Sequence, residues 1–239
     1  MVDAVDRSAP TGGRAVRTVI AVAGGDPVPP TVLDRLPSDA LVIAADSGLQ
    51  VATSLGLTTD IVVGDMDSVD PALLERARAG GAEVQRHPAA KNHTDLELAL
   101  DVALGFDPAR IVVVGGHGGR LDHLIANVLL LARPAHDHLD LSAHMGEAEV
   151  HVVHTRCDLV GIPGELVSLM PVHGPVEGVT TDGLLYPLAG EDLAPGSTRG
   201  VSNELAQPSA SVQVTGGTLL VVRPGALGTH VLSRTEPTP

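Results

Sequence analysis

Short runs of β-branched residues alternate with segments of helical periodicity through the first half of the chain, and this alternation constrains the fold more than any other feature. The runs are rich in Val and Ile, and they cover residues 18–25, 40–46, 60–65, 82–87 and 110–116. The segments with helical spacing of apolar residues cover residues 49–55, 71–79, 95–104 and 121–132. Strands that alternate with helices of this length indicate βαβ units on a mostly parallel sheet. Since nearly continuous apolar strands suit a sheet covered on both faces, we predict a Rossmann-like α/β domain over residues 18–140.

The pattern changes after the sequence ARPAHDH at residues 132–138. From about Leu139, short strand-like runs are separated by Gly and Pro, and little helical periodicity remains. Asp182-Gly183 predicts a hairpin turn between two such runs. This pattern favours an all-β sandwich domain over residues 141–239. The segment 1–17 lacks the apolar core of a signal peptide, and we interpret it as a mobile tail.

Composition excludes several classes of protein. Hydrophobic residues make up 44% of the 239 residues, but there is one Phe, one Tyr and no Trp, so the core is expected to be aliphatic. A net charge of −14 argues against a nucleic-acid backbone as partner. No apolar run approaches the roughly 20 residues of a membrane span, which argues against a membrane protein. The single Cys cannot form an intrachain disulfide, and we therefore expect a cytoplasmic protein.

Polar side chains follow four of the predicted strands. Asp46 follows the second strand, and Asp65 and Asp67 follow the third. Residues i and i+2 of an extended chain lie on one face, so the last two carboxylates would repel each other unless a positive charge lay between them. The other polar or glycine positions at these strand ends are Ser47, Gly48, Ser68, Thr94, Asp95, Gly116, Gly118, Arg120, Asp122 and His123. Because ligands of open α/β sheets bind at the carboxyl ends of the strands, these residues are candidates for one site.

Each of these residues also has a purely structural interpretation. Asp65 can cap a turn, and Thr94 with Glu97 has the spacing of a capping box. Asp95 and Asp122, each in the first turn of a predicted helix, can offset the helix dipole. Taken together, however, four or five carboxylates at one sheet edge would be strongly repulsive without a cation. Hard oxygen ligands favour Mg²⁺, which commonly binds one or two carboxylates together with substrate phosphates.

A glycine-rich turn and an arginine complete this set. Residues 115–119 contain four glycines and lead into a predicted helix, whose N-terminal N–H groups can bind phosphate. Arg120 can contact a phosphate bidentately. Carboxylates, Mg²⁺, arginine and such a turn indicate phosphoryl transfer. The chain is not a P-loop protein, because its only lysine, Lys91, precedes Asn92, and the turn does not match G-x-G-x-x-G, because Leu121 takes the place of the third glycine.

A set of motifs occurs in a particular order from about Val19 to Val222. These are AADSG, VVGDMDS, a Thr-Asp pair opening a helix, GGRLDH with Asn127 downstream, and TTDGLLYPL followed by GVSNE. In this order the motifs resemble those of the thiamine pyrophosphokinase (thiamine diphosphokinase) family. The resemblance implies an α/β nucleotide-binding catalytic domain followed by a β-sandwich thiamine-binding domain. It also implies a homodimer that transfers the pyrophosphoryl group of Mg-ATP to the hydroxyethyl oxygen of thiamine and releases AMP.

The resemblance also implies roles for individual residues. The implied metal ligands are Asp65, Asp67 and Asp95, which are also expected to be catalytic together with Arg120 and Asp122. The implied ATP contacts are Asp46, Ser47, Gly48, Ser68, Gly116, Gly118, Arg120, His123 and Asn127. The implied thiamine contacts are Thr94, Thr181, Tyr186, Ser202 and Asn203. Tyr186, the only tyrosine, also has a physical reason to bind this substrate, because a cation such as thiamine gains on the order of 1 kcal/mol from an aromatic face.

Two departures from the family pattern leave alternatives open. Ala90 and Asn92 stand where many members of the family carry carboxylates. The same site is compatible with a pyrophosphokinase that acts on another primary alcohol, such as a hydroxymethyl-pterin. It is also compatible with a relative that binds a nucleotide without turnover and acts as a sensor.

Overall fold

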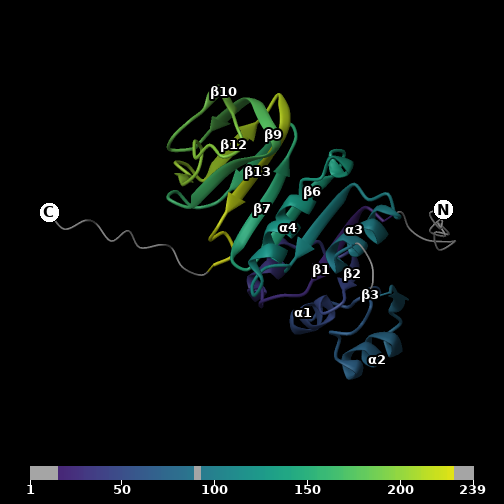
Figure 1. The fold of residues 1–239 in the computed structure, drawn as a ribbon. Coiled ribbons are helices and arrows are strands. Elements are labelled where there is room, and N and C mark those ends of the chain that lie inside the picture. The colour runs from purple at the N-terminus through teal and green to yellow at the C-terminus, as the bar shows by residue number, and fades with distance from the viewer. Residues whose placement is uncertain (1–15, 89–92, 229–239) are drawn as a thin grey trace, which may run out of the picture. The chain divides into compact units, whose positions relative to one another are not determined.

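The structure, a computed structural model, describes residues 16–88 and 93–228. Nearly all of the predicted tail 1–17 lies outside the described residues, as do Ala90, Lys91 and Asn92. The described residues form a mixed α/β fold with many strands and few helices, drawn in Figure 1. They divide into two compact units, one made of the described residues up to Asp26 together with Leu36–Gly119, and the other made of Pro27–Arg35 together with the described residues from Arg120 onward. None of the helices in this described part has the length and apolar character needed to span a membrane.

The first unit contains a parallel sheet of five strands. Its strands are β1 (Thr18–Ala23), β2 (Leu41–Ala45), β3 (Ile61–Gly64), β4 (Glu83–Arg86) and β5 (Arg110–Val114), in the order β4-β3-β2-β1-β5. Its helices are α1 (Gly48–Ser54), α2 (Pro71–Ala79) and α3 (Asp95–Leu104). Each strand lies within a range that the alternating sequence pattern predicts, α2 and α3 match their predicted ranges, and α1 begins one residue before its predicted range. The strand and helix predictions for this half of the chain are therefore confirmed.

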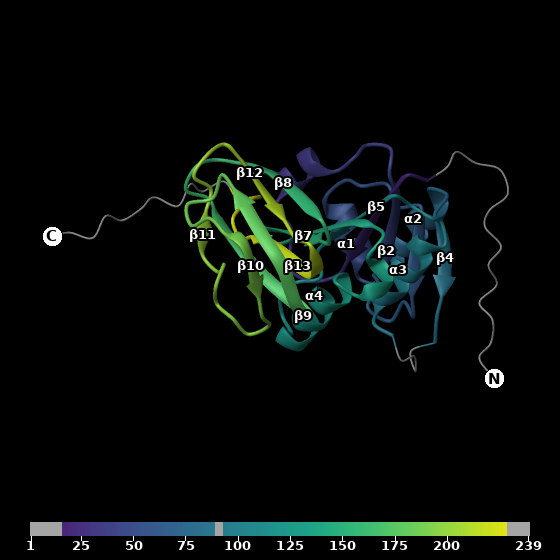
Figure 2. The ribbon, with the colours of Figure 1, turned by 90° about the horizontal axis from the view of Figure 1, so that it is seen from above.

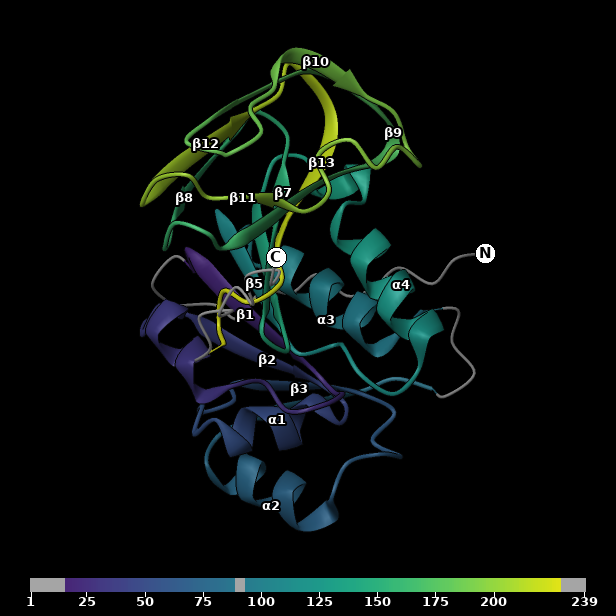
Figure 3. The ribbon, with the colours of Figure 1, turned by 90° about the vertical axis from the view of Figure 1, so that its left-hand side faces the viewer.

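The core of the first unit is aliphatic, as the composition predicts. Ala21, Val62 and Val113 are wholly buried at the centres of their strands. Helix α3 packs against β1, β2 and β3, and α1 packs against β1, β2 and α2; Figure 3 shows α1 and α2 side by side. Because these strands are parallel, the carboxyl ends of β1, β2, β3 and β5 lie at the same edge of the sheet. The loops at this edge carry the polar residues.

The second unit is mostly antiparallel. It begins with the 3₁₀ helix η1 (Pro30–Arg35), α4 (Leu121–Leu131) and the 3₁₀ helix η2 (Pro134–His136). Its strands are β6 (Asp140–Met145), β7 (Ala148–Val153), β8 (Arg156–Val160), β9 (Leu166–Asp182), β10 (Ala189–Leu193), β11 (Asn203–Glu204), β12 (Ser209–Gln213) and β13 (Gly216–Arg223). The order is β6-β7-β13-β9-β12-β8, with β10 and β11 also paired to β9. Figure 2 shows β10, β12 and β13 around β9.

Strand β9 organises this unit. Its 17 residues pair with β11 near the start, with β13 along the middle, and with β10 and β12 near the end. The left-handed backbone of His173, with φ of 61°, lies where the pairing with β13 is interrupted. One strand therefore contributes to several pairings around an apolar core that includes Leu169, Val179 and Val212.

The predicted hairpin at Asp182-Gly183 is wrong in detail. The chain does turn there, and Gly183 has a φ of 75°, but the returning strand is β10 and not the segment 184–188. The reason lies in longer-range pairing. Leu184 forms a bridge with Leu205, and Thr181 and Leu188 exchange hydrogen bonds that close a wider loop.

A buried ion network crosses the second unit. Arg223, only 3% exposed, donates from Nη1 to Glu149 Oε2 at 2.6 Å, and from Nη2 to Glu165 Oε2 at 2.6 Å and to the Val160 carbonyl at 3.1 Å. Burial by itself raises the pKa of Glu149, but the hydrogen bond and charge of His151 and the charge of Arg223 outweigh it and lower the pKa to about 2. The network ties β13, β7 and the β8–β9 connection together through a single cation.

Candidate active site

Three carboxylates of the first unit meet at the carboxyl edge of its sheet. Asp46 directly follows β2, and Asp65 and Asp67 follow the neighbouring strand β3. One oxygen from each of these three side chains lies within 4.8 Å of the other two. Asp46 is 3% exposed, Asp65 is half-buried and Asp67 is exposed, so the group opens toward solvent on one side.

The backbone around Asp46 fixes its side chain in this group. Asp46 has a φ of 45°, a conformation that residues other than glycine rarely adopt, and its N–H donates to the Val63 carbonyl at 2.8 Å. Its Oδ1 accepts the N–H of Met66 at 3.1 Å. Across from it, Gly64 has a φ of 148°, and a Cβ there would press against the Asp46 side chain. This strained and buried conformation is typical of positions that serve a binding site.

Electrostatics shows that these carboxylates repel one another. The pKa of Asp46 is raised first by burial, then by the negative charge of Asp95, with smaller contributions from Asp65 and Asp67. The N–H of Ser47 partly opposes this effect. Asp95, in the first turn of α3, is therefore close enough to act on Asp46, although it is not in the group of three. A divalent cation would relieve this repulsion, and oxygen ligands of this kind suit Mg²⁺.

Several residues of this site also make the local hydrogen bonds and the helix cap that the sequence suggested. Asp65 Oδ1 accepts the N–H of Asp67 at 3.1 Å, and Ser68 donates its hydroxyl to Asp67 Oδ1 at 2.8 Å. Thr94 caps α3 by accepting the N–H of Glu97 at 3.2 Å, as the capping-box spacing predicts. A carboxylate has two oxygens with about four acceptor positions, so Asp65 and Asp67 retain acceptors for a ligand.

The glycine-rich turn after β5 packs closely against the turn after β1. Gly116, expected to contact the nucleotide, donates its N–H to the Gly24 carbonyl at 3.0 Å, and this bond holds the two turns together. Gly118 has a φ of 86°, and a Cβ there would collide with the Asp26 carboxylate. Gly48 opens α1, where a Cβ would run into the Val22 carbonyl. Glycine at these positions lets the loops at the sheet edge approach one another.

The remaining nucleotide candidates belong to the second unit, at the start of α4. Arg120 and Asp122 form an exposed ion pair, with Nε to Oδ1 at 3.1 Å and Nη2 to Oδ2 at 2.5 Å. The hydrogen bond from Arg120 lowers the pKa of Asp122. His123 is exposed, whereas Asn127, one turn further along the helix, is buried. The two contacts with Asp122 use Nε and Nη2, so Arg120 can bind a phosphate through Nη1.

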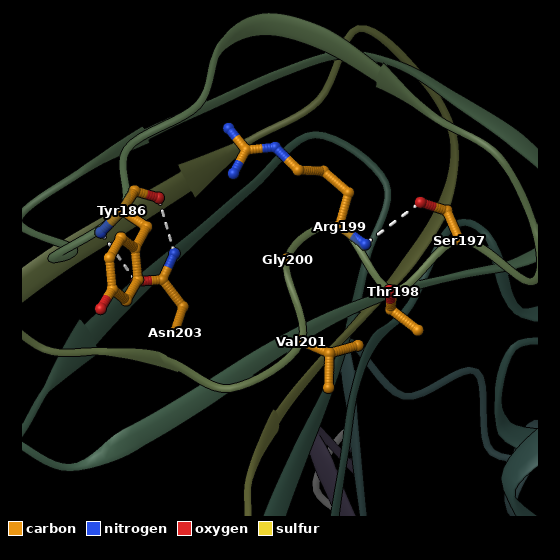
Figure 4. Close-up of a pocket in the computed structure, with 7 residues that line it drawn as sticks. All are labelled: Tyr186, Ser197, Thr198, Arg199, Gly200, Val201 and Asn203. Carbon is orange, nitrogen blue, oxygen red and sulfur yellow. Dashed lines mark hydrogen bonds between the residues drawn. The ribbon is translucent and has the colours of Figure 1, made fainter.

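The second unit also contains a pocket of about 440 Å³. It is lined by Tyr186, Asn203 and residues 197–201, shown in Figure 4. Tyr186 is 55% exposed, and Asn203 is 2% exposed. Asn203 donates from Nδ2 to the Tyr186 carbonyl at 2.7 Å, and its Oδ1 accepts the N–H of Tyr186 at 3.0 Å and that of Glu204 at 2.9 Å. Asn203 therefore holds the backbone of the only tyrosine in place.

The other thiamine candidates are placed differently. Thr181 is buried, and its hydroxyl accepts the N–H of Leu188 at 2.9 Å. Ser202 has a φ of 57° and is exposed. Neither residue lines the pocket. Gly200 and Val201 belong to the quoted GVSNE motif, but sequence reasoning missed residues 197–199, which include Arg199, because a loop without regular spacing carries no pattern that marks it.

Replacing Asn203 with Ala is expected to lower the free energy of unfolding by ~1–3 kcal/mol, because the buried amide would no longer make its hydrogen bonds to the Tyr186 backbone. Urea unfolding followed by circular dichroism measures this change. The Ser202→Ala variant is the control, since this neighbouring side chain is exposed, and we expect a change within about 0.5 kcal/mol. Equal stability of the two variants would show that the Asn203 hydrogen bonds do not stabilise the fold.

Comparison with known proteins gives consistent results for both halves of the chain. A family model described as the catalytic domain of thiamin pyrophosphokinase matches residues 33–143, and a model described as its vitamin B1 binding domain matches residues 150–219. The thiamine pyrophosphokinase of Bacillus subtilis (strain 168) is 27% identical over 219 residues, which cover 87% of this chain and 99% of that protein.

Solved structures show the same likeness. The crystal structure of thiamine pyrophosphokinase from Bacillus subtilis has a TM-score of 0.76 at 27% identity and covers 87% of this chain and 98% of that one. The crystal structure of thiamin pyrophosphokinase from Geobacillus thermodenitrificans has a TM-score of 0.73 at 27% identity, covering 86% and 96%. Because the two family models together match residues 33–143 and 150–219, which is well over half of the chain, it belongs to the thiamine pyrophosphokinase family.

Proposed function

We propose that this protein is a thiamine pyrophosphokinase that transfers the pyrophosphoryl group of Mg-ATP to the hydroxyethyl oxygen of thiamine, giving thiamine diphosphate and AMP. Both family models and the curated relative support this function. The observation that carries the proposal is the convergence of Asp46, Asp65 and Asp67 at one sheet edge, where their mutual repulsion calls for a cation. This arrangement suits phosphoryl transfer, in which positioning and charge stabilisation dominate.

The residues at this edge fit Mg²⁺. We propose Asp65, Asp67 and Asp95 as the ligands, with Asp46 supporting them from its buried position. When bound, the ion would neutralise the negative charge of the ATP phosphates. The raised pKa of Asp46 agrees with this proposal, because burial and the charges of three other carboxylates make its ionised form costly without a nearby positive charge.

The proposed reaction is an in-line displacement. The hydroxyethyl oxygen of thiamine forms a bond to the β-phosphorus of ATP while the bond from that phosphorus to the α-phosphate oxygen breaks, and AMP leaves with the electron pair. The proton of the alcohol passes to a carboxylate, for which we propose Asp95. Further ATP contacts are proposed for Ser47, Gly48, Ser68, Gly116, Gly118, Arg120, Asp122, His123 and Asn127.

We assign the thiamine ring to the pocket at Tyr186. Tyr186 is the only aromatic residue of its lining, and an aromatic face attracts a cationic ring. Asn203 acts there by holding Tyr186, and Thr94, Thr181 and Ser202 remain proposed contacts. By function, we propose a Rossmann-like nucleotide-binding domain over residues 18–140 and a β-sandwich thiamine-binding domain over residues 141–239. We also propose that this protein, with its single cysteine, is cytoplasmic.

One assay tests the function against its alternatives. The full chain is incubated with ATP, Mg²⁺ and thiamine, and AMP is measured. AMP formation that depends on thiamine supports the proposal. AMP formation only with another primary alcohol, such as a hydroxymethyl-pterin, would change the substrate. Tight binding of ATP without AMP under any of these conditions would indicate a nucleotide sensor.

We further propose that the protein is a homodimer that associates through α4. Leu121, Ile125 and Leu129 are spaced by four residues along one stripe of this helix, and all three are exposed. An apolar stripe of this kind, on a helix otherwise anchored by the buried Asn127 and Leu131, is typical of an interaction surface.

The Ile125→Glu variant is therefore expected to be a monomer, because a charge in the middle of an apolar interface is not tolerated. Light scattering after size-exclusion chromatography, at micromolar concentration, gives the mass of wild type and variant. Val160→Glu is the matched control, since this exposed valine lies on β8 outside the stripe, and it should remain dimeric. A monomeric wild type would contradict the homodimer, and a dimeric Ile125→Glu variant would exclude this stripe as the interface.

A further inference from the structure

The pocket at Tyr186 has one charged residue in its lining, Arg199. In Figure 4 its side chain extends from the segment 197–201 toward the side of the pocket that carries Tyr186. Its guanidinium is paired bidentately with Glu191 of β10, with Nε to Oε2 at 2.9 Å and Nη2 to Oε1 at 2.8 Å. Glu191 itself does not line the pocket. Glu191 therefore acts on a ligand in the pocket only indirectly, by its effect on the charge of Arg199.

A cationic substrate makes this pair significant. A guanidinium alone in the wall would repel thiamine, whose ring carries a permanent positive charge. The hydrogen bond and charge of Arg199 lower the pKa of Glu191, so the carboxylate stays ionised at neutral pH. The pair as a whole is then neutral, and Tyr186 can attract the cation without repulsion from Arg199.

The position of the wall does not depend on this ion pair alone. The Gly200 carbonyl accepts the N–H of Leu169 on β9 at 3.0 Å, and Ser202 donates its N–H to Ser168 Oγ at 3.1 Å. Arg199 also donates its N–H to Ser197 Oγ at 3.1 Å. Because these bonds fix the segment to β9, the charge of Glu191 can be removed while the wall stays in place.

We infer that Glu191 is a positioning residue that sets the charge selectivity of the pocket: by neutralising Arg199 it lets the pocket bind a cationic ring. This inference rests on the proposed function and adds a residue outside the motifs of the family resemblance. It predicts discrimination between thiamine and its neutral isostere, the analogue in which carbon replaces the charged ring nitrogen. A purely structural role for Glu191 predicts no such discrimination.

The test is the Glu191→Gln variant, which keeps the side-chain shape and an acceptor for Arg199. We measure AMP formation with thiamine and with the neutral isostere. KM for thiamine is expected to rise about tenfold, the size expected for one uncompensated charge several ångström from a cation at a half-exposed site. KM for the isostere should change less than about twofold, and kcat should not change, because no reacting group is altered.

Two further variants separate charge from structure. Glu191→Gln combined with Arg199→Gln removes both charges, and KM for thiamine should return to within about twofold of wild type. Asp158→Asn removes the carboxylate that pairs with Arg156, in an exposed ion pair outside the pocket lining. It should leave both KM values unchanged. Equal changes for the two substrates, or no change for either, would overturn the inference. If the wild type forms no AMP with thiamine, the proposed function itself is wrong, and the inference falls with it.

Discussion

Replacing Asp67 with Asn is expected to reduce thiamine-dependent AMP formation by about 10²–10³-fold, because the acidic group would lose one of the charges that hold the cation and stabilise the phosphates. The amide keeps the size of the side chain and the acceptor for the Ser68 hydroxyl. The measurement is kcat/KM for ATP at saturating Mg²⁺. Asp67→Asn should also melt at the same or a higher temperature than wild type, because the charge of Asp67 contributes to the repulsion felt by Asp46.

The matched control for this prediction is Asp101→Asn. Asp101 is an exposed carboxylate on α3 in the same unit, and it is not in the acidic group. The Asp101→Asn substitution removes the same formal charge as Asp67→Asn, so the comparison separates a local effect from a change in net charge. We expect activity within about twofold of wild type, as for most surface substitutions. Normal turnover by Asp67→Asn would contradict the assignment of Asp67 as a ligand of the cation.

Replacing Arg223 with Met is expected to lower the free energy of unfolding by ~3–5 kcal/mol, because it leaves Glu149 buried without its cation. Glu165 and the Val160 carbonyl lose the same partner, so the β8–β9 connection should loosen as well. Urea unfolding measures the loss. Arg156→Met is the control, since its pair with Asp158 is exposed at the surface, and no measurable loss is expected.

The pH dependence of stability gives a second measurement on the same network. The pKa of Glu149 falls from its ordinary value of 4.5 to about 2 in the folded protein. A lowered pKa means that this group stabilises the fold above about pH 4.5 and that the contribution is lost as the pH falls toward 2. The Glu149→Gln variant should therefore lose less stability than wild type over that interval. Parallel curves for the two proteins would contradict the role given to Glu149.

The sequence indicated the candidate site better than its detailed contacts. Asp46, Asp65 and Asp67 follow consecutive apolar runs, and parallel pairing of β2 with β3 brings their strand ends to one edge. The spacing Thr94 to Glu97 predicted the cap of α3, because capping depends on residues three positions apart. In contrast, no pattern in the sequence indicated that Asn203 uses its amide on the Tyr186 backbone, 17 residues away.

Amino-acid order by itself determined the strands and helices of the first half of the chain, the aliphatic core and the position of its polar strand ends. These features depend on local periodicity, which each segment carries in its own residues. Only the tertiary structure decided that β9 runs unbroken to Asp182, that Glu149 lies against Arg223, and that Glu191 neutralises the cation in the pocket wall. These contacts join distant residues, and their partners are set by strand pairing and burial, which a local pattern does not encode.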